Sequence, residues 1–339
     1  MLSVYDLDAV TAFCRKNGIH DHALKRFYIA FLKKGRPLDD CLQALPEPGR
    51  SVFASHVKFH QLTLAEKYDS GIDGATKLVF KTHEGFRLET VILRITSGRT
   101  SLCISSQVGC AAACAFCATG KMGLMRNLTT HEILDQVILA MRILREEGRA
   151  LRNVVFMGMG EPFHNEKAVY EALEVLRDAK GCYFAERHLL VSTVGMAAAM
   201  VRFVERFPDI RIALSLHSAR QDVRRELMPS GKSQSLERLR AIFPIVGKHG
   251  NFMVEYLMLK GVNDGPEDLA ALIDLLRGVN VHINLIQFNP HPGAEFEPVT
   301  KQAREAFGAA LRKQGFKVTL RYSLGNDIAA ACGQLAGKN

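Results

Sequence analysis

Hydrophobic residues recur at helical spacing near the N-terminus and change to an alternating pattern at about residue 75. The helical spacing predicts helices over residues 6–16 and 20–34, each ended by a glycine-containing turn. The alternating pattern predicts strands over 76–82, 87–95 and 100–105, with Glu84-Gly85 as a hairpin turn. The first hundred residues therefore predict a helical segment followed by a short β extension.

Strands and helices alternate over the next two hundred residues. The predicted strands are 153–157, 188–193, 210–216, 252–259, 281–288 and 317–322, and the predicted helices are 130–147, 166–179, 197–207, 236–249, 267–277 and 301–314. The helix at 130 follows Thr129-Thr130-His131-Glu132, which has the spacing of a capping box. This alternation predicts an α/β protein with a parallel sheet, whose ligand site lies at the carboxyl ends of the strands.

The pattern divides the chain into four parts. Residues 1–65 form a helical accessory domain, 66–100 a β extension, 101–322 the α/β unit, and 323–339 a C-terminal loop. The second helix places basic residues beside aromatic ones, namely Lys25, Arg26, Lys33 and Lys34 beside Phe27, Tyr28 and Phe31. Such a segment can bind RNA phosphates and bases, or it can be an amphipathic helix with its aromatic rings in the core.

Composition narrows the class of protein. Of 339 residues, 47% are hydrophobic and 23% charged, as in ordinary globular proteins. No apolar run has the length of a membrane span and no signal peptide is recognisable, so we expect a cytoplasmic protein without a membrane partner. The net charge of +9 favours a polyanionic partner such as nucleic acid.

Three of the eight cysteines lie within one short stretch, at Cys110, Cys114 and Cys117. Thiolates select zinc or iron–sulfur clusters. Three ligands suit a [4Fe-4S] cluster with one open iron, whereas a closed zinc site needs a fourth ligand. The nearest downstream histidine, His131, is the candidate for that zinc alternative.

Four predicted strands end in polar or glycine-rich segments. These are Gly158-Met-Gly160-Glu161, Ser192-Thr193, Ser215-Leu216-His217 and Asn289-Pro290. Any one of these segments, taken alone, could be an ordinary loop that ends a strand. Together they lie at the same edge of the predicted sheet as the cysteine stretch, and Glu161 offers a carboxylate to an ammonium group. This edge is therefore the predicted site.

The cysteine spacing, with Phe116 before the last cysteine, resembles the signature of radical SAM enzymes. Four blocks resemble the RlmN/Cfr family of radical SAM rRNA adenine methyltransferases more narrowly: residues 102–110, 156–162, 215–217 and 327–335. The resemblance covers about residues 75–336. It implies a partial (β/α)6 radical SAM barrel over 101–322, carrying the small N-terminal helical domain and the short β extension.

The resemblance also implies a role for each matching residue. Cys110, Cys114 and Cys117 match the ligands of the [4Fe-4S] cluster. The positions that match contacts to S-adenosyl-L-methionine are Gly160, Glu161, Ser192, Ser215, Leu216, His217 and Asn289. Cys332 matches the cysteine that carries the methyl group, Cys103 the second catalytic cysteine, and Glu89 a glutamate with a proton-transfer role.

The implied reaction transfers a methyl-derived carbon to C2 or C8 of an adenosine in 23S rRNA, with tRNA as a further candidate substrate. The carbon is attached to Cys332 and joined to the base. Attack by the Cys103 thiolate then releases the product and leaves a disulfide. This implies an electron donor for the cluster, a disulfide reductant and a monomeric enzyme.

Two other classes remain open from the sequence: a radical SAM enzyme of the same fold acting on a non-RNA substrate, and a non-enzymatic RNA-binding or zinc protein. The run 229–234 departs from the family's usual sequence, so RNA contacts there are expected to differ. The sequence does not decide between C2 and C8. Cys14, Cys41 and Cys182 match no motif and are expected to be packing residues.

Overall fold

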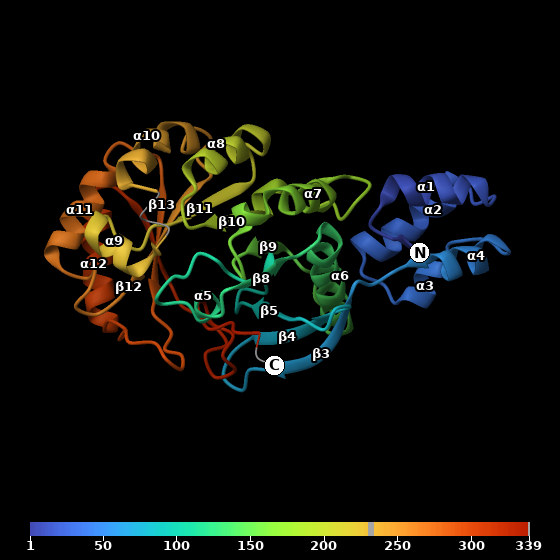
Figure 1. Cartoon of the computed structure of the whole chain (residues 1–339), viewed down its shortest axis with the longest axis horizontal. Coiled ribbons are helices and arrows are strands. Elements are labelled where there is room, and N and C mark those ends of the chain that lie inside the picture. The colour runs from blue at the N-terminus through green and yellow to red at the C-terminus, as the bar shows by residue number, and fades with distance from the viewer. Residues whose placement is uncertain (230–233, 338–339) are drawn as a thin grey trace.

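The computed structural model describes residues 1–229 and 234–337 and places ten strands in one sheet, in the order β14-β13-β12-β11-β10-β9-β6-β5-β4-β3 (Figure 1). Their bounds are β3 (Leu62–Asp69), β4 (Ala75–Thr82), β5 (Arg87–Arg94), β6 (Thr100–Cys103), β9 (Asn153–Phe156), β10 (Leu189–Thr193), β11 (Arg211–Ser215), β12 (Phe252–Met258), β13 (His282–Gln287) and β14 (Lys317–Arg321). Residues 230–233, in the run that departs from the family sequence, and 338–339, at the end of the C-terminal loop, lie outside the described residues.

The sheet has a parallel part and an antiparallel part. Neighbouring strands from β6 through β14 are parallel, whereas β6, β5, β4 and β3 pair antiparallel. Within the described chain β14 and β3 do not pair with each other, so the curved sheet remains open at one side. The predicted α/β class, the partial barrel and its β extension are confirmed.

Helices cover the outer surface of the parallel part (Figure 1). They are α6 (Thr130–Glu146), α7 (Glu166–Arg177), α8 (Ala197–Arg206), α9 (Gln221–Leu227), α10 (Leu236–Val246), α11 (Pro266–Leu276) and α12 (Lys301–Lys313), with short turns α5 (Ala118–Lys121), η2 (Pro162–Asn165) and η3 (Glu186–His188). All but α9 and the short turns were predicted, with ends within a few residues. Among the described helices, none is long and apolar enough to cross a membrane.

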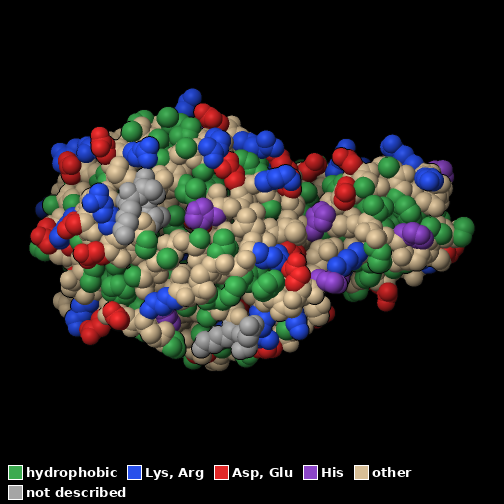
Figure 2. Space-filling model, viewed as in Figure 1, with side chains coloured by type: hydrophobic (Ala, Val, Ile, Leu, Met, Phe, Trp, Pro, Cys, Tyr) green, Lys and Arg blue, Asp and Glu red, His purple; other side chains and the backbone are tan. Residues whose placement is uncertain are grey.

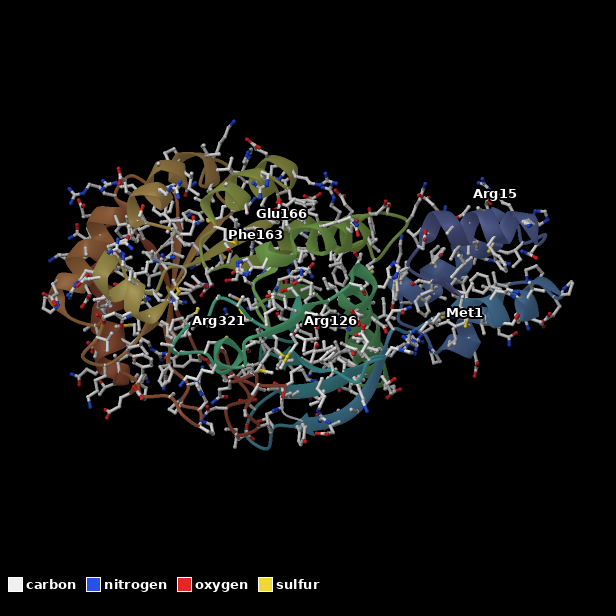
Figure 3. All side chains as sticks on the ribbon, in the orientation of Figure 1. Met1, Arg15, Arg126, Phe163, Glu166 and Arg321 are labelled. Carbon is white, nitrogen blue, oxygen red and sulfur yellow. The ribbon has the colours of Figure 1, made fainter. Side chains whose placement is uncertain are left out.

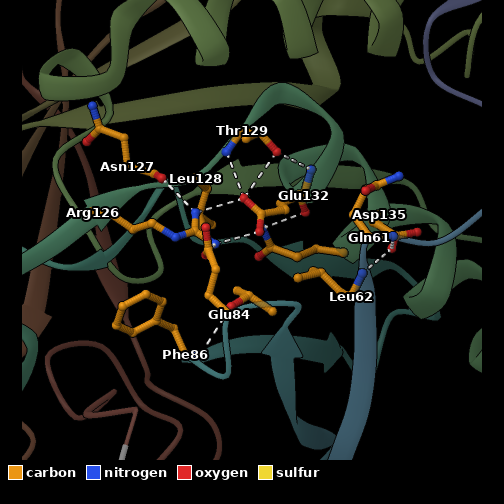
Figure 4. Close-up of polar contacts among 12 residues, drawn as sticks. Gln61, Leu62, Glu84, Phe86, Arg126, Asn127, Leu128, Thr129, Glu132 and Asp135 are labelled. Atoms are coloured by element: carbon orange, nitrogen blue, oxygen red, sulfur yellow. Dashed lines mark hydrogen bonds and ion pairs between the residues drawn. The ribbon is translucent and has the colours of Figure 1, made fainter. Parts of the chain in front are cut away.

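The start of α6 shows why its boundary was predictable. The Thr129 hydroxyl accepts a hydrogen bond from the Glu132 backbone N–H at 3.2 Å, and the Glu132 carboxylate accepts one from Thr129 N–H at 2.9 Å (Figure 4). This is the predicted capping box. Leu134 and Ile138 on the same helix are fully buried, and burial of each such side chain contributes about 2 kcal/mol.

The N-terminal residues form a lobe beside the barrel (Figure 1). It contains β1 (Leu2–Ser3), α1 (Leu7–Lys16), α2 (Asp21–Tyr28), a π-helical turn η1 (Ile29–Lys33), α3 (Leu38–Leu42), α4 (Gly49–His56) and β2 (Val57–Lys58). Phe27, Tyr28 and Phe31 lie in its core, so the interpretation in which these rings stack on RNA bases is wrong. The basic residues Lys25, Arg26 and Lys34 are exposed, and Lys33 is half-buried.

One buried carboxylate joins this lobe to the barrel. Asp135 on α6 accepts hydrogen bonds from the Tyr5 hydroxyl at 2.6 Å, from the backbone of Gln61 at 2.7 Å and from the backbone of Leu62 at 2.8 Å (Figure 4). His60 Nδ1 also lies 2.6 Å from it. The first strand of the sheet, β3, therefore begins at the same point where the lobe is attached.

Candidate active site

A cavity with about 940 Å³ of empty space lies at the carboxyl ends of the parallel strands. Its lining includes most of the predicted site residues: Cys110, Cys114, Cys117, Gly160, Glu161, Ser192, Ser215, His217 and Cys332. These residues come from segments spread over more than two hundred sequence positions. The parallel topology brings them together because all the strands end at one edge.

The cysteine stretch is held between two short strands, β7 (Gln107–Gly109) and β8 (Leu124–Asn127). Arg126 on β8 pairs with Glu132 at 2.7 Å and with Glu84 at 2.6 Å, which ties this hairpin to α6 and to the β extension (Figure 4). The backbone of Cys110 donates to the carbonyl of Gly123 at 2.9 Å. The hairpin was not predicted, because strands of three or four residues give too little alternation to recognise.

Burial is the main influence on the pKa values of the three cysteine thiols. It raises the pKa of Cys110 to about 11, and it also raises the pKa values of Cys114 and Cys117. As free groups they therefore hold their protons, and a bound metal would have to displace them. Three thiols lining one cavity fit a [4Fe-4S] cluster held by three thiolates.

The zinc alternative lacks its fourth ligand. His131 is absent from the cavity lining, and its ring packs against Tyr5 with centroids 5.9 Å apart. Among residues 1–229 and 234–337, no three His, Cys, Asp or Glu side chains converge on a single metal ion.

Glu161 presents a buried carboxyl group to the cavity. Its two oxygens accept hydrogen bonds from the backbone N–H groups of Val194 at 2.8 Å and Phe163 at 3.0 Å. Burial nevertheless raises the pKa of this carboxyl to about 7. Gly160 has a φ of +102°, and a Cβ there would lie 2.6 Å from the Gln107 side chain, so the approach to Glu161 requires glycine.

Ser192, Ser215 and His217 line the same cavity as Glu161. The Ser192 and Ser215 hydroxyls lie 3.3 Å apart. His217 accepts a hydrogen bond at Nδ1 from Leu257 N–H at 3.0 Å, and burial together with nearby Arg224 lowers its pKa to about 3, so the ring is neutral. Leu216 is fully buried behind the cavity and does not line it.

Asn289 holds the C-terminal loop instead of lining this cavity. Its side-chain amide donates to the Cys332 carbonyl at 3.1 Å and to the Ser323 hydroxyl at 2.9 Å. Gln334 donates to the Pro290 carbonyl at 2.7 Å, on the other side of Cys332. The loop is therefore fixed at both sides of this cysteine, and a direct contact of Asn289 with the cofactor stays a prediction.

A second, larger cavity extends through the barrel interior to the same loop. Cys103, at the end of β6, lines only this second cavity, whereas Cys332 lines both. Burial and the neighbouring Cys332 raise the pKa of Cys103 to about 12, and the Arg321 guanidinium opposes that rise. The structure thus places the two predicted catalytic cysteines as neighbours.

Two charged residues in the barrel interior were missed from the sequence. Arg321 ends β14 inside the barrel, with Nη1 at 3.9 Å from Glu255 on β12 (Figure 3). Asn284 donates to the same Glu255 oxygen at 2.9 Å, and burial raises the pKa of this carboxyl. For Glu255 the only available signal was a lone charge in the otherwise apolar strand β12, and Arg321, in a strand that also carries Lys317, had no such signal.

Glu89 lines neither of the two cavities. Its carboxylate accepts a hydrogen bond from Ala336 N–H at 3.0 Å and lies 3.6 Å from the Lys77 ammonium. It therefore holds the end of the C-terminal loop, and its proton-transfer role stays a prediction. Cys14, Cys41 and Cys182 are buried among apolar side chains, as expected for packing residues.

Known proteins resemble this chain in sequence and in fold. Residues 104–276 match the radical SAM superfamily. A probable RNA methyltransferase of Rhodopirellula baltica is 53% identical over 83% of this chain and 75% of its own. The dual-specificity RNA methyltransferase RlmN of Ruthia magnifica is 41% identical over 79% of this chain and 76% of its own. The crystal structure of a radical SAM methyltransferase from Sphaerobacter thermophilus superposes over 100% of both chains with a TM-score of 0.93 at 36% identity.

Proposed function

The chain belongs to the radical SAM superfamily and, within it, to the RlmN family of RNA methyltransferases, and from this we propose the reaction that its two cysteines perform. The enzyme transfers a methyl-derived carbon to C2 or C8 of an adenosine in 23S rRNA, with tRNA as a second candidate substrate. The observation that carries this proposal is the position of Cys332, which lines both cavities.

In this proposal the cofactor and the RNA base bind in different cavities. We assign the first cavity to the [4Fe-4S] cluster, held by Cys110, Cys114 and Cys117, and to S-adenosyl-L-methionine. When bound, these groups supply the methyl carbon and the radical that activates it. Glu161 offers its carboxylate to the ammonium of the cofactor, and the serine hydroxyls and the neutral His217 offer polar contacts around it. The second cavity takes the adenine.

The chain's own residues carry the carbon between the cavities. Cys332 loses its thiol proton on taking the methyl group. Activation removes one hydrogen from that group, and its carbon then bonds to the ring carbon of the base. The ring carbon gives up its own hydrogen as a proton, together with one electron that the cluster would take back. The Cys103 thiolate then forms a bond to the Cys332 sulfur while the sulfur–carbon bond breaks. That bond's electron pair goes to the carbon, which takes up a proton as the methylated base leaves. The Arg321 guanidinium stabilises the attacking thiolate, because it opposes the rise in the pKa of Cys103.

The product enzyme holds a Cys103–Cys332 disulfide, so each turnover needs an external thiol reductant. The cluster needs a separate electron donor. We place the enzyme in the cytoplasm, where thiols are kept reduced, and we propose that it acts as a monomer.

Anaerobic purification followed by methyl transfer from labelled cofactor to a 23S rRNA transcript tests this function. We expect a brown protein with about four irons per chain. Cys110→Ala should lose both the iron and the transfer, whereas Cys182→Ala, which alters a packing cysteine, should retain both. A colourless protein that holds stoichiometric zinc and is fully active would contradict the proposal.

A further inference from the structure

The second cavity has a strongly basic outer end. Arg99, Arg187 and Arg211 are exposed and line it at the amino ends of β6, β10 and β11, opposite the cofactor end of the barrel. Arg152 lies at the amino end of β9, between them in the sheet. We call these four residues the arginine rim. Among the described residues, no side-chain ion pair neutralises any of the four.

The positive charges on this face help to lower the pKa values of two histidines. Burial and the charges of Arg152, Arg187 and Arg211 lower the pKa of His188. Burial and the charges of Arg211 and Lys317 lower the pKa of His282, further along the sheet. The arginine rim thus acts on His188, and Arg211 together with Lys317, at the amino end of β14, acts on His282.

Two carboxylates close to the lining of this cavity already have partners. Glu147 pairs with Arg94 at 2.5 Å. Asp73, which also lines the cavity, accepts a hydrogen bond from Gly325 N–H at 2.8 Å. Neither carboxylate is thus available to neutralise the four arginines.

Polar side chains continue inward from the rim. His188 bonds to Asn153 at 2.9 Å, and Asn153 donates to Ser101 at 3.0 Å. Deeper inside stand Glu255 and Arg321, next to the catalytic cysteines. The second oxygen of Glu255 is buried and has no hydrogen-bond partner within the described chain. The inner end thus offers a free acceptor and a guanidinium, which are groups that pair with the edge of a base.

We propose that the target nucleotide reaches Cys332 through this second cavity, and that the arginine rim binds the RNA phosphates that flank it. This inference rests on the proposed function, since it requires an RNA substrate. It places RNA and cofactor at opposite ends of the barrel, so that both can be bound at the same time. A base inside a duplex would have to be turned out of its stack to enter.

The extent of the rim favours RNA over a small anion. A single phosphate or carboxylate needs one or two arginines, whereas the rim follows four strands, β6, β9, β10 and β11, that lie side by side. Neighbouring strands are about 4.8 Å apart, so the charges extend over more than one phosphate group. A ribose–phosphate chain matches that length.

The test compares Arg187→Gln/Arg211→Gln with the wild type in two measurements on a 23S rRNA transcript: binding at about 50 to 200 mM salt, and the KM for methyl transfer. Each lost phosphate contact should lower the slope of log affinity against log salt by about 0.7 and weaken binding about fivefold at ~0.1 M salt. KM should rise with Kd, while iron content and methylation of Cys332 without RNA stay at wild-type levels.

Lys167→Gln/Lys301→Gln is the matched control, because it removes the same charge from the exposed first turns of α7 and α12. This variant should bind RNA as the wild type does. If the arginine variant keeps the wild-type salt slope and KM, the rim is not the RNA site, although the methyltransferase assignment stands. If the wild type transfers no methyl group to RNA, the proposed function fails and this inference fails with it.

Discussion

Glu161 is fully buried, and both its oxygens accept hydrogen bonds from backbone N–H groups. Such contacts lower the pKa of a carboxyl group, yet burial outweighs them and brings the pKa of Glu161 to about 7. No cationic side chain is paired with Glu161 in the described chain. A carboxylate held in this way gains most from a cation that arrives with a ligand.

Under the proposed pairing of Glu161 with the cofactor ammonium, cofactor affinity should depend on pH. The ammonium would pair with the ionised carboxylate, so binding would release the carboxyl proton and affinity should fall as pH drops through about 7. We expect about tenfold weaker binding at about pH 6 than at about pH 8. Equilibrium dialysis with labelled cofactor measures the difference. Glu161→Gln should bind weakly at both values, and an unchanged wild-type affinity would show that Glu161 does not meet the ammonium.

Short motifs at strand ends were enough to select residues that the structure brings together around one cavity, although their contacts with the cofactor stay predictions. Arg321 and Glu255 were not selected, since neither stands in a motif of this kind. Asn289 was selected as a cofactor contact, but the structure gives it a contact with the Cys332 carbonyl that no spacing in the sequence could indicate.

At the scale of elements, the helices and strands with a regular apolar pattern were the ones predicted from the sequence. The long helices and buried strands of the barrel were recognised because their apolar pattern is strong. Strand β3 was missed, and it crosses the boundary placed at residue 65. It lies at the edge of the sheet, where only Leu62 among its residues is buried, so its sequence lacks the alternation of a half-buried strand.

The N-terminal lobe contacts the barrel at several points, including the Arg142 guanidinium over the Phe31 ring and the Lys33 ammonium over the Tyr183 ring. Asp135 on α6 holds the start of β3, where the two parts join. Asp135→Ala would leave the Tyr5 hydroxyl and two backbone N–H groups without an acceptor. We expect a loss of about 3 kcal/mol or more in the free energy of unfolding, measured by denaturant titration, and faster proteolysis within residues 1–61. Asp39→Ala, at an exposed position on α3, should change stability by less than about 0.5 kcal/mol. Equal stability of the two variants would refute this account of the attachment.

On the scale of the whole molecule, the net charge of +9 is not visible as a single basic patch on the face shown in Figure 2. Figure 2 shows basic and acidic side chains interspersed over one face of the barrel and the lobe. The basic residues of α2 and its continuation lie on the lobe, which stands beside the barrel (Figure 1). A large RNA that reaches the barrel can also contact this lobe.

Phosphate contacts by the lobe should appear as salt dependence. Replacing Lys25, Arg26, Lys33 and Lys34 by Gln should reduce the slope of log affinity against log salt by up to about 3, at about 0.7 per contact. Iron content should not change, because none of the four lines the cavity that contains Cys110, Cys114 and Cys117. Filter binding of a 23S rRNA transcript over a range of salt concentrations measures the slope. If the slope is unaltered, these residues form only a solvated helix face.

The central claim is that Cys332 carries the carbon to the base and Cys103 releases it. The two cysteines act in sequence, so their loss should have different consequences. Cys103→Ala can still attach the carbon to the base but cannot break the bond to Cys332. Cys332→Ala and the double variant have no carrier for the carbon.

Denaturing electrophoresis after anaerobic reaction with a 23S rRNA transcript tests this claim most directly. Cys103→Ala should accumulate a covalent protein–RNA species that ribonuclease shortens, and the wild type, Cys332→Ala and the double variant should not. Normal turnover by Cys103→Ala, with release of methylated adenosine, would contradict the two-cysteine account.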